Sequence, residues 1–127
     1  EMYLHMDISE AGVGYKREIH HDNDNRIAAF VYYLNDKGSM KGGEFEIHQY
    51  SNGRPLAECP PHPDPKDMEL SHSFQPTANT MILFLSSPNS YHSVPVVTQA
   101  IKPRRFVYGG LTTKEPFAWR GAIRSRK

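Results

Sequence analysis

Most of the chain consists of short segments in which apolar and polar positions alternate, separated by turn residues. Alternation with a period of two is typical of a strand that turns one face to a core. Turn residues gather at 35–38 and 86–90, where Asn, Asp, Gly, Ser and Pro favour a change of direction. We predict strands at residues 3–8, 16–22, 26–34, 43–50, 79–85, 91–98 and 104–112. Short strands with such punctuation predict an all-β barrel or sandwich.

Two stretches do not follow this pattern. Residues 115–124 are the one candidate for a short helix, because no other segment keeps a helical period. Residues 51–75 hold five of the ten prolines and show no period. Long segments without regular structure in a compact domain usually serve as lids or binding loops. We therefore predict that 51–75 is a Pro-rich loop or lid.

Composition narrows the class of protein. The 127 residues suffice for a single domain, 1–127, with one core. Fifteen basic and 14 acidic residues give a net charge of +1, which offers no electrostatic case for nucleic acid or a membrane surface. The single cysteine, Cys59, excludes an internal disulfide and favours a reducing compartment, so we expect a cytoplasmic protein. The chain begins with Glu1 rather than Met, and an excised core without N-terminal supporting elements is one expectation.

The strongest chemical signal is a His-x-Asp pair followed much later by one histidine. His20 and Asp22 lie two apart on a predicted strand, so their side chains point to the same face. His92 can complete a set of two imidazoles and one carboxylate. That set is the facial triad of non-haem Fe(II) oxygenases, which leaves metal positions open for substrate and oxygen.

Two other pairs compete with it. The pair His62 and Asp64 is disfavoured, because alternating prolines remove the amide donors that a strand needs. The pair His5 and Asp7 remains an open alternative, since 3–8 is itself a predicted strand. His21 is expected to face away from the metal, as a surface residue or a support behind the ligands.

In chain order, the motifs resemble the Fe(II)- and 2-oxoglutarate-dependent dioxygenase superfamily, in its prolyl 4-hydroxylase-like branch. They are His20-x-Asp22-Asn23, Arg26, Tyr32-Tyr33-Leu34-Asn35, Gly42-Gly43-Glu44-Phe45-Glu46-Ile47, residues 79–84, His92-x-Val94-x-Val96 and Arg104-x-Phe106-Val107-x-Gly109. The resemblance implies a double-stranded β-helix, a jelly-roll and cupin-like barrel with the metal in its mouth. Members often carry a tryptophan near the position of Gly110, which this chain lacks.

The resemblance also implies roles for individual residues. His20, Asp22 and His92 match the iron ligands. Arg104 matches the basic residue that binds the far carboxylate of 2-oxoglutarate, and a guanidinium suits this task because it binds a carboxylate through two hydrogen bonds. Arg105, next to it, stays open as the alternative. Tyr33 matches the tyrosine whose hydroxyl shares that carboxylate, and Phe45 matches an apolar wall of the same pocket. Tyr15 is expected near the cosubstrate or the substrate.

The implied function is hydroxylation of an unactivated C–H bond, with peptidyl proline as the default substrate and release of succinate and carbon dioxide. Fe(II) and 2-oxoglutarate are the implied metal and cosubstrate, ascorbate is a further candidate, and the expected partner is a peptide or small-molecule substrate. Two alternatives remain: a cupin-like binding domain without catalysis, and a metal-dependent enzyme without an oxoacid cosubstrate. The pairing of Tyr33 with Arg104 favours the 2-oxoglutarate interpretation over both.

Overall fold

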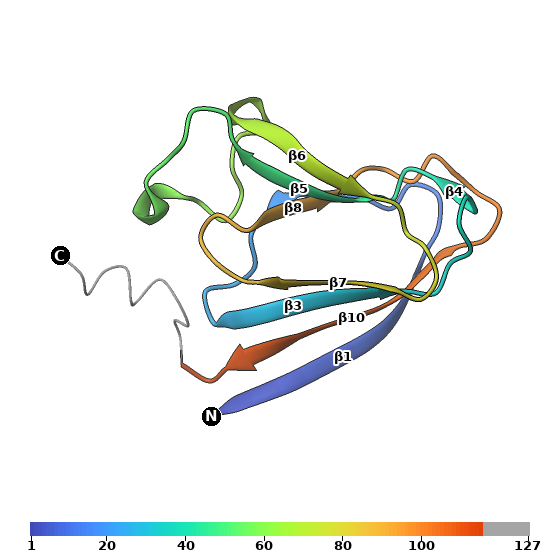
Figure 1. Cartoon of the computed structure of the whole chain (residues 1–127), viewed down its shortest axis with the longest axis horizontal. Helices are drawn as coiled ribbons and strands as arrows, with labels where there is room; N and C mark the ends of the chain where they lie inside the picture. The colour runs from blue at the N-terminus through green and yellow to red at the C-terminus, as the bar shows by residue number, and fades with distance from the viewer. Residues whose placement is uncertain (116–127) are drawn as a thin grey trace.

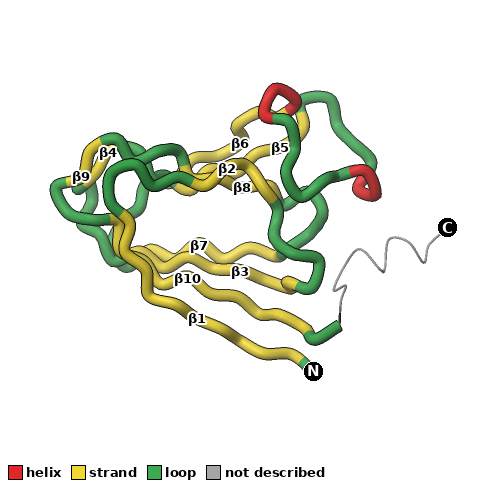
Figure 2. The backbone as a smooth tube through the Cα atoms, turned by 180° about the vertical axis from the view of Figure 1, so that it is seen from behind, coloured by secondary structure: helices red, strands yellow, loops and turns green. Residues whose placement is uncertain are grey.

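The computed structural model describes residues 1–115 and consists of two four-stranded antiparallel sheets that face each other (Figures 1 and 2). The major sheet has the order β1-β10-β3-β7, and the minor sheet has the order β2-β8-β5-β6. Strands of the major sheet are β1 (Met2–Ala11), β10 (Arg104–Thr113), β3 (Arg26–Tyr33) and β7 (Thr80–Leu85). Strands of the minor sheet are β2 (Arg17–His20), β8 (Tyr91–Val94), β5 (Phe45–Tyr50) and β6 (Met68–Phe74). A small third sheet pairs β4 (Met40–Lys41) with β9 (Gln99–Ala100).

The core lies between the two large sheets. Alternation along β3 buries Ala29, Val31 and Tyr33 and leaves the residues between them more exposed. Phe106 from β10 and Phe45 from β5 complete the same buried cluster. The β-branched and aromatic side chains that favour strands therefore also supply the contacts between the sheets. The predicted all-β jelly roll is confirmed.

The seven predicted strands are all present, with shifted ends. β1 is longer than the predicted 3–8, and β2 ends at His20, so Asp22 lies beyond the strand. β8 ends at Val94, well short of residue 98. The two-residue strands β4 and β9 were not predicted, because so short a segment carries no period.

The prediction of a continuous loop over 51–75 is wrong at its C-terminal end. β6 pairs with β5 along its length and forms an edge of the minor sheet. Its apolar positions, Met68, Leu70 and Phe74, do alternate, but an exposed edge strand buries little and shows only a weak pattern. What remains, residues 51–67, contains two 3₁₀ turns, Leu56–Glu58 and Pro65–Asp67.

The outer face of the major sheet is apolar and exposed. Ile8 pairs with Val107, and Val107 faces away from the core because its neighbour Phe106 faces inward. The side chains of this face that are most exposed, from 55% to 83%, are Met2, Leu4, Met6, Ile8, Met81, Leu83 and Leu85. No helix of the described residues is long and apolar enough to cross a membrane. The helix predicted at 115–124 lies outside the described residues apart from its first position.

Candidate metal centre and cosubstrate cavity

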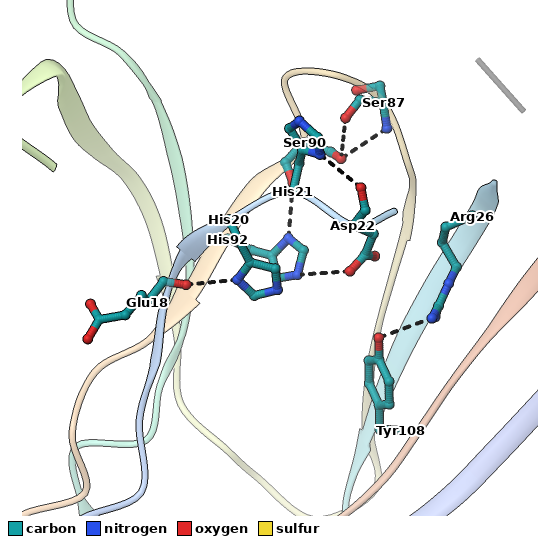
Figure 3. Close-up of polar contacts among 9 residues, drawn as sticks. All are labelled: Glu18, His20, His21, Asp22, Arg26, Ser87, Ser90, His92 and Tyr108. Atoms are coloured by element: carbon teal, nitrogen blue, oxygen red, sulfur yellow. Dashed lines mark hydrogen bonds and ion pairs between the residues drawn. The ribbon is translucent and has the colours of Figure 1, made fainter. Parts of the chain in front are cut away.

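His20, Asp22 and His92 come together at one end of the space between the sheets. His20 at the end of β2 pairs directly with His92 on β8, and their ring centroids are 4.4 Å apart. Asp22 reaches the same point from the turn after β2 (Figure 3). One potential ligand atom from each of the three lies within 4.8 Å of the others. Among the described residues, this is the one group of histidine, cysteine and acidic side chains with metal-binding geometry.

Backbone carbonyls fix the orientation of both imidazoles. Nδ1 of His20 lies 2.7 Å from the carbonyl oxygen of Glu18, and Nδ1 of His92 lies 2.9 Å from that of Ser90 (Figure 3). A carbonyl only accepts, so each Nδ1 carries the hydrogen and donates it. The Nε2 atom of each ring therefore keeps a lone pair for a metal, and the ring is oriented from behind.

Burial keeps both imidazoles neutral. Loss of hydration lowers the pKa of His92 to about 4, although the charge of Asp22 acts in the opposite direction. Burial also lowers the pKa of His20. Neutral imidazole is the form that ligates metals, so neither ring needs to lose a proton at neutral pH.

Asp22 provides the clearest test of whether a cation fits. It is 8% exposed, and its Oδ1 atom lies 3.7 Å from Nε2 of His92. Its Oδ2 atom is buried and has no hydrogen-bond partner among the described residues. A buried carboxylate oxygen without a partner is costly unless a cation binds it. Two nitrogens and one carboxylate are the set that suits Fe(II), so the residues present fit that metal.

The two histidines of the triad line a cavity of about 370 Å³ between the sheets. His20 and His92 line one end, and Arg104 with Phe106 lines the other. The remaining lining side chains come from both sheets and are Ser9, Glu10, Ala11, Tyr15, Arg17, Val31, Phe45, Phe84, Val94 and Tyr108. Most of this wall is apolar, with charges placed at a few points, as is usual for a small-molecule site.

Arg104 is almost completely buried, with 1% of its surface exposed. Its Nη2 donates to the Tyr33 hydroxyl at 3.3 Å, and its Nε donates to the carbonyl of Gly43 at 3.1 Å. Its guanidinium carbon also lies 4.2 Å from the centroid of the Phe106 ring. No carboxylate of the described residues pairs with it. A rigid buried cation of this kind suits an incoming carboxylate.

The choice between Arg104 and Arg105 follows from the alternation of β10. Arg105 lies on the outer face, where its Nε is 2.7 Å from Oε2 of Glu10. Arg104 is therefore the arginine in the cavity. Tyr33 lies beside it, and burial raises the pKa of Tyr33 more than the charge of Arg104 lowers it, so the hydroxyl keeps its proton. Phe45 lies nearer the metal end, with its ring stacked on His92 at a centroid distance of 5.4 Å.

Two further histidines near the centre are buried. Of the two positions expected for His21, the surface is excluded, because His21 is 3% exposed and its backbone N–H donates to the carbonyl of Pro61 at 3.1 Å. His48 is also buried, with Nε2 2.8 Å from the Ser93 hydroxyl oxygen. The pattern could not show this, because both are covered by residues distant in sequence.

The competing pairs do not converge on a metal. His5 packs against Tyr108, with ring centroids 6.3 Å apart, and is not part of the metal-binding group. Asp64 caps the turn at Pro65–Asp67 by accepting from the backbone N–H of Lys66 at 3.1 Å. His62 nevertheless lies near the centre, since its ring centroid is 6.2 Å from that of His20. That proximity was not predicted from the sequence.

The missing tryptophan near Gly110 has a structural counterpart. A Cβ atom at Gly110 would collide with the guanidinium of Arg26, so Arg26 fills the space above this glycine. Nη1 of Arg26 also donates to the Tyr108 hydroxyl at 3.2 Å (Figure 3). The wall near Asp22 is thus built from an arginine and a tyrosine.

Comparisons with known proteins agree with this geometry. The family model described as the 2OG-Fe(II) oxygenase superfamily matches residues 4–110. A prolyl-4-hydroxylase from Pseudomonas putida has 21% identity and a TM-score of 0.60, over 90% of this chain and 55% of its own. An oxidoreductase of the 2OG-Fe(II) oxygenase family from Burkholderia pseudomallei has 19% identity and a TM-score of 0.57, over 94% of this chain and 48% of that protein.

A prolyl 4-hydroxylase structure from Phytophthora capsici has 20% identity and a TM-score of 0.52, over 89% of this chain and 32% of that protein. The chain thus spans about half or less of the length of these three proteins. At such identities the likeness concerns the fold. No curated protein matches the chain.

Proposed function

The chain belongs to the 2OG-Fe(II) oxygenase superfamily, and from that premise we propose that it hydroxylates an unactivated C–H bond, with peptidyl proline as the first substrate to test. The observation that carries the proposal is a buried Asp22 oxygen, without a hydrogen-bond partner among the described residues, beside two histidines that line the same cavity as Arg104. When bound, Fe(II) would activate dioxygen, the oxidant: one oxygen atom would go to the substrate C–H bond and the other to succinate, as 2-oxoglutarate is oxidised with loss of carbon dioxide.

The residues of this chain would bind, orient and shield. His20, Asp22 and His92 would hold the metal, and the carbonyls of Glu18 and Ser90 keep both rings aligned. At the far end, Arg104 and the Tyr33 hydroxyl would bind a carboxylate and so set the direction of the cosubstrate. The segment 51–67 lies beside the metal end, where the Pro61 carbonyl accepts from the backbone N–H of His21 just after β2, and we propose it as the part that shields the bound substrate.

The test is anaerobic calorimetry of the metal-free protein, first with Fe(II) and then with 2-oxoglutarate. His92→Ala should abolish Fe(II) binding, because one of three ligands is lost. Arg104→Lys should leave Fe(II) binding intact and weaken 2-oxoglutarate binding about tenfold or more, because the two-point contact is lost while the charge remains. Arg105→Lys is the matched control and should change neither affinity, since Arg105 lies on the outer face.

Other outcomes would contradict the proposal in recognisable ways. Fe(II) binding without any 2-oxoglutarate binding would indicate a metal-dependent enzyme that uses no oxoacid. Absence of Fe(II) binding would favour the non-catalytic binding domain. Turnover is then measured as succinate formed with and without a proline-containing peptide, in parallel assays with and without ascorbate.

A further inference from the structure

Arg17 is a second cation in the cavity wall, and neither metal nor cosubstrate binding gives it a task. It lies on β2 and pairs with Val94 of β8. Directly paired residues of an antiparallel ladder project to the same side of the sheet. Val94 is buried and lines the cavity, so Arg17 also projects toward the cavity.

A register irregularity brings Arg17 to this side. Residues 17 and 20 are three apart and would point to opposite faces of a regular strand. The pairing of β2 with β8 shifts between Arg17 and His20, and both side chains line the same cavity. Irregularities of this kind occur often beside active sites, where they redirect a side chain. The bulge therefore places a guanidinium on the same wall as a metal ligand.

The charge of Arg17 acts on the metal end of the cavity. Burial is the main cause of the lowered pKa of His92 and of His20, and the charge of Arg17 lowers both further. Burial raises the pKa of Tyr108, and the charge of Arg17 opposes that rise. Arg17 is thus electrostatically close to two members of the triad, His20 and His92, and to Tyr108.

No acidic side chain of the described residues forms an ion pair with Arg17. Its neighbour Glu18 pairs with Lys16, with Nζ and Oε1 2.6 Å apart. Glu10, the acidic residue among those that line the cavity, pairs with Arg105. Arg17 is also exposed, so an incoming anion can reach it from solvent.

We propose that the primary substrate presents a carboxylate to Arg17, which holds that group at the mouth of the cavity next to the metal. This inference rests on the proposed function, and it adds the chemical class of the substrate. A guanidinium binds a carboxylate through two parallel hydrogen bonds and stays charged at any working pH. The carboxylate belongs either to a small acid or to an acidic peptide, and the probes below distinguish these sources.

The experiment measures probe binding to Mn(II)-loaded protein by paramagnetic broadening of the proton resonances of the probe. The small-molecule pair is N-acetyl-proline and its primary amide. The peptide pair is a blocked proline–aspartate dipeptide and its proline–asparagine equivalent. Each pair differs by one carboxylate, and each is titrated with and without saturating 2-oxoglutarate, so the comparison remains valid whether or not the cosubstrate binds.

In the wild-type protein, the acid of at least one pair should bind about tenfold more tightly than its amide, as expected for a charge-assisted contact that is partly exposed. Arg17→Gln should abolish that preference. Lys16→Gln is the matched control: it removes one positive charge at the adjacent residue, outside the cavity, and should keep the preference.

Two results would overturn the inference: no acid binds more tightly than its amide, or the preference survives in Arg17→Gln. Failure of the proposed function looks different, because 2-oxoglutarate would then not bind to the Mn(II)-loaded protein. If 2-oxoglutarate binds normally but no acid is preferred over its amide, only the inference of a substrate carboxylate at Arg17 is refuted, and the proposed function stands.

Discussion

At the scale of single residues, the Asp22 carboxylate destabilises the metal-free protein. Its Oδ2 atom is buried without a hydrogen-bond partner among the described residues, a situation that costs about 1–3 kcal/mol of folding free energy. The cost is removed when a cation binds. The same atom therefore links stability to metal occupancy.

We expect Asp22→Asn to raise the free energy of unfolding of the metal-free protein by about 1 kcal/mol, because the buried charge is removed. The substitution should also abolish stabilisation by metal, which for the wild type is about 2.7 kcal/mol at a metal concentration one hundred times the Kd. Thermal unfolding with and without Mn(II) measures both effects. A variant that is still stabilised by Mn(II) would show that Asp22 is not a ligand.

The histidines should make the metal-free protein sensitive to acid. His92 has a pKa of about 4 when folded against 6.5 as its reference value. Below pH 6.5 the unfolded chain binds a proton that the folded chain does not, so the free energy of unfolding falls with pH between about 6.5 and 4, by up to about 1.4 kcal/mol per pH unit for this residue.

Urea unfolding at several pH values in the presence of a chelator measures this slope. His92→Asn should reduce it by about one proton, whereas stability above pH 7 should not depend on this group. His20 and His48 act in the same direction, since burial lowers the pKa of each. An unchanged slope in His92→Asn would mean that His92 is protonated in the folded protein.

The three side chains that the structure brings together could be picked out from the sequence, and their role as metal ligands stays a prediction. His20 and Asp22 were recognisable by their spacing, and His92 by the order of motifs. Arg17 could not be found, because strict alternation places it opposite His20 and only the bulge reverses this. Arg104 was preferred, but Arg105 stayed open, because one residue of register decides which of them faces the cavity; the structure places Arg104 there.

At the scale of elements, the two prolines Pro60 and Pro61 connect the strands that carry the ligands. The carbonyl of Pro61 accepts from the N–H of His21, next to β2. The carbonyl of Pro60 accepts from the Tyr91 hydroxyl on β8 at 2.6 Å. Each contact involves the immediate neighbour of a histidine ligand, so the segment helps to set the spacing of β2 and β8 at the centre.

We expect Tyr91→Phe to weaken metal binding about tenfold, the lower end of what is seen when a supporting hydrogen bond behind a metal ligand is lost. The ring remains, so the packing should change little. Tyr32→Phe is the control, because its hydroxyl bonds Asn79 on the exposed side of the major sheet. Calorimetric titration of both variants with Mn(II) measures the difference, and equal affinities would show that the prolines do not position the ligands.

Gly42 is another point where an element depends on close approach. Gly42 and Gly38 share a φ of +77°, but a Cβ at Gly42 would collide with the backbone of Val96, whereas nothing lies within 4 Å at Gly38. Gly38→Ala should therefore cost about 1 kcal/mol for its backbone conformation. Gly42→Ala should cost about 3 kcal/mol, because Val96 must move as well. Urea unfolding measures the loss of stability in each variant, and the difference between them is the cost of the collision with Val96. Equal losses in the two variants would contradict a steric contribution at Gly42.

The elements themselves were largely predictable, because strands with one buried face show their period in the sequence. β3 is an example, with Ala29, Val31 and Tyr33 at alternate buried positions. β6 was missed because both of its faces are mostly exposed, so its sequence shows no clear alternation between buried and exposed positions. Its pairing with β5 depends on backbone hydrogen bonds, which leave little trace in side-chain pattern.

At the scale of the whole molecule, the main feature is the exposed apolar outer face of the major sheet. A contiguous apolar surface on a soluble protein usually marks an interface or an aggregation site. Ile8 and Leu83 are 83% and 64% exposed on this face. Within residues 1–115, no helix covers it.

We expect the 127-residue chain to bind a hydrophobic dye and to associate at high concentration. Ile8→Lys and Leu83→Lys should reduce both, because each places a charge on the face, and neither should alter Mn(II) binding. Leu70→Lys is the control, since Leu70 is 54% exposed but lies on β6 of the other sheet. Sedimentation at several concentrations gives the answer; equal association of all three variants would exclude this face as the cause.

The pairing of β1 with β10 has a consequence for biosynthesis. The ladder joins Met2 to Thr113 and Ala11 to Arg104, so the first of the described strands to be synthesised pairs with the last of them. β1 therefore cannot pair with β10 until nearly all of the described chain has been synthesised, and its apolar side chains stay uncovered until then. Arg104, the proposed carboxylate-binding residue, is also made late, because it lies at the start of β10. Chains that end before β10 should consequently leave the apolar side chains of β1 uncovered and should depend on chaperones to stay in solution.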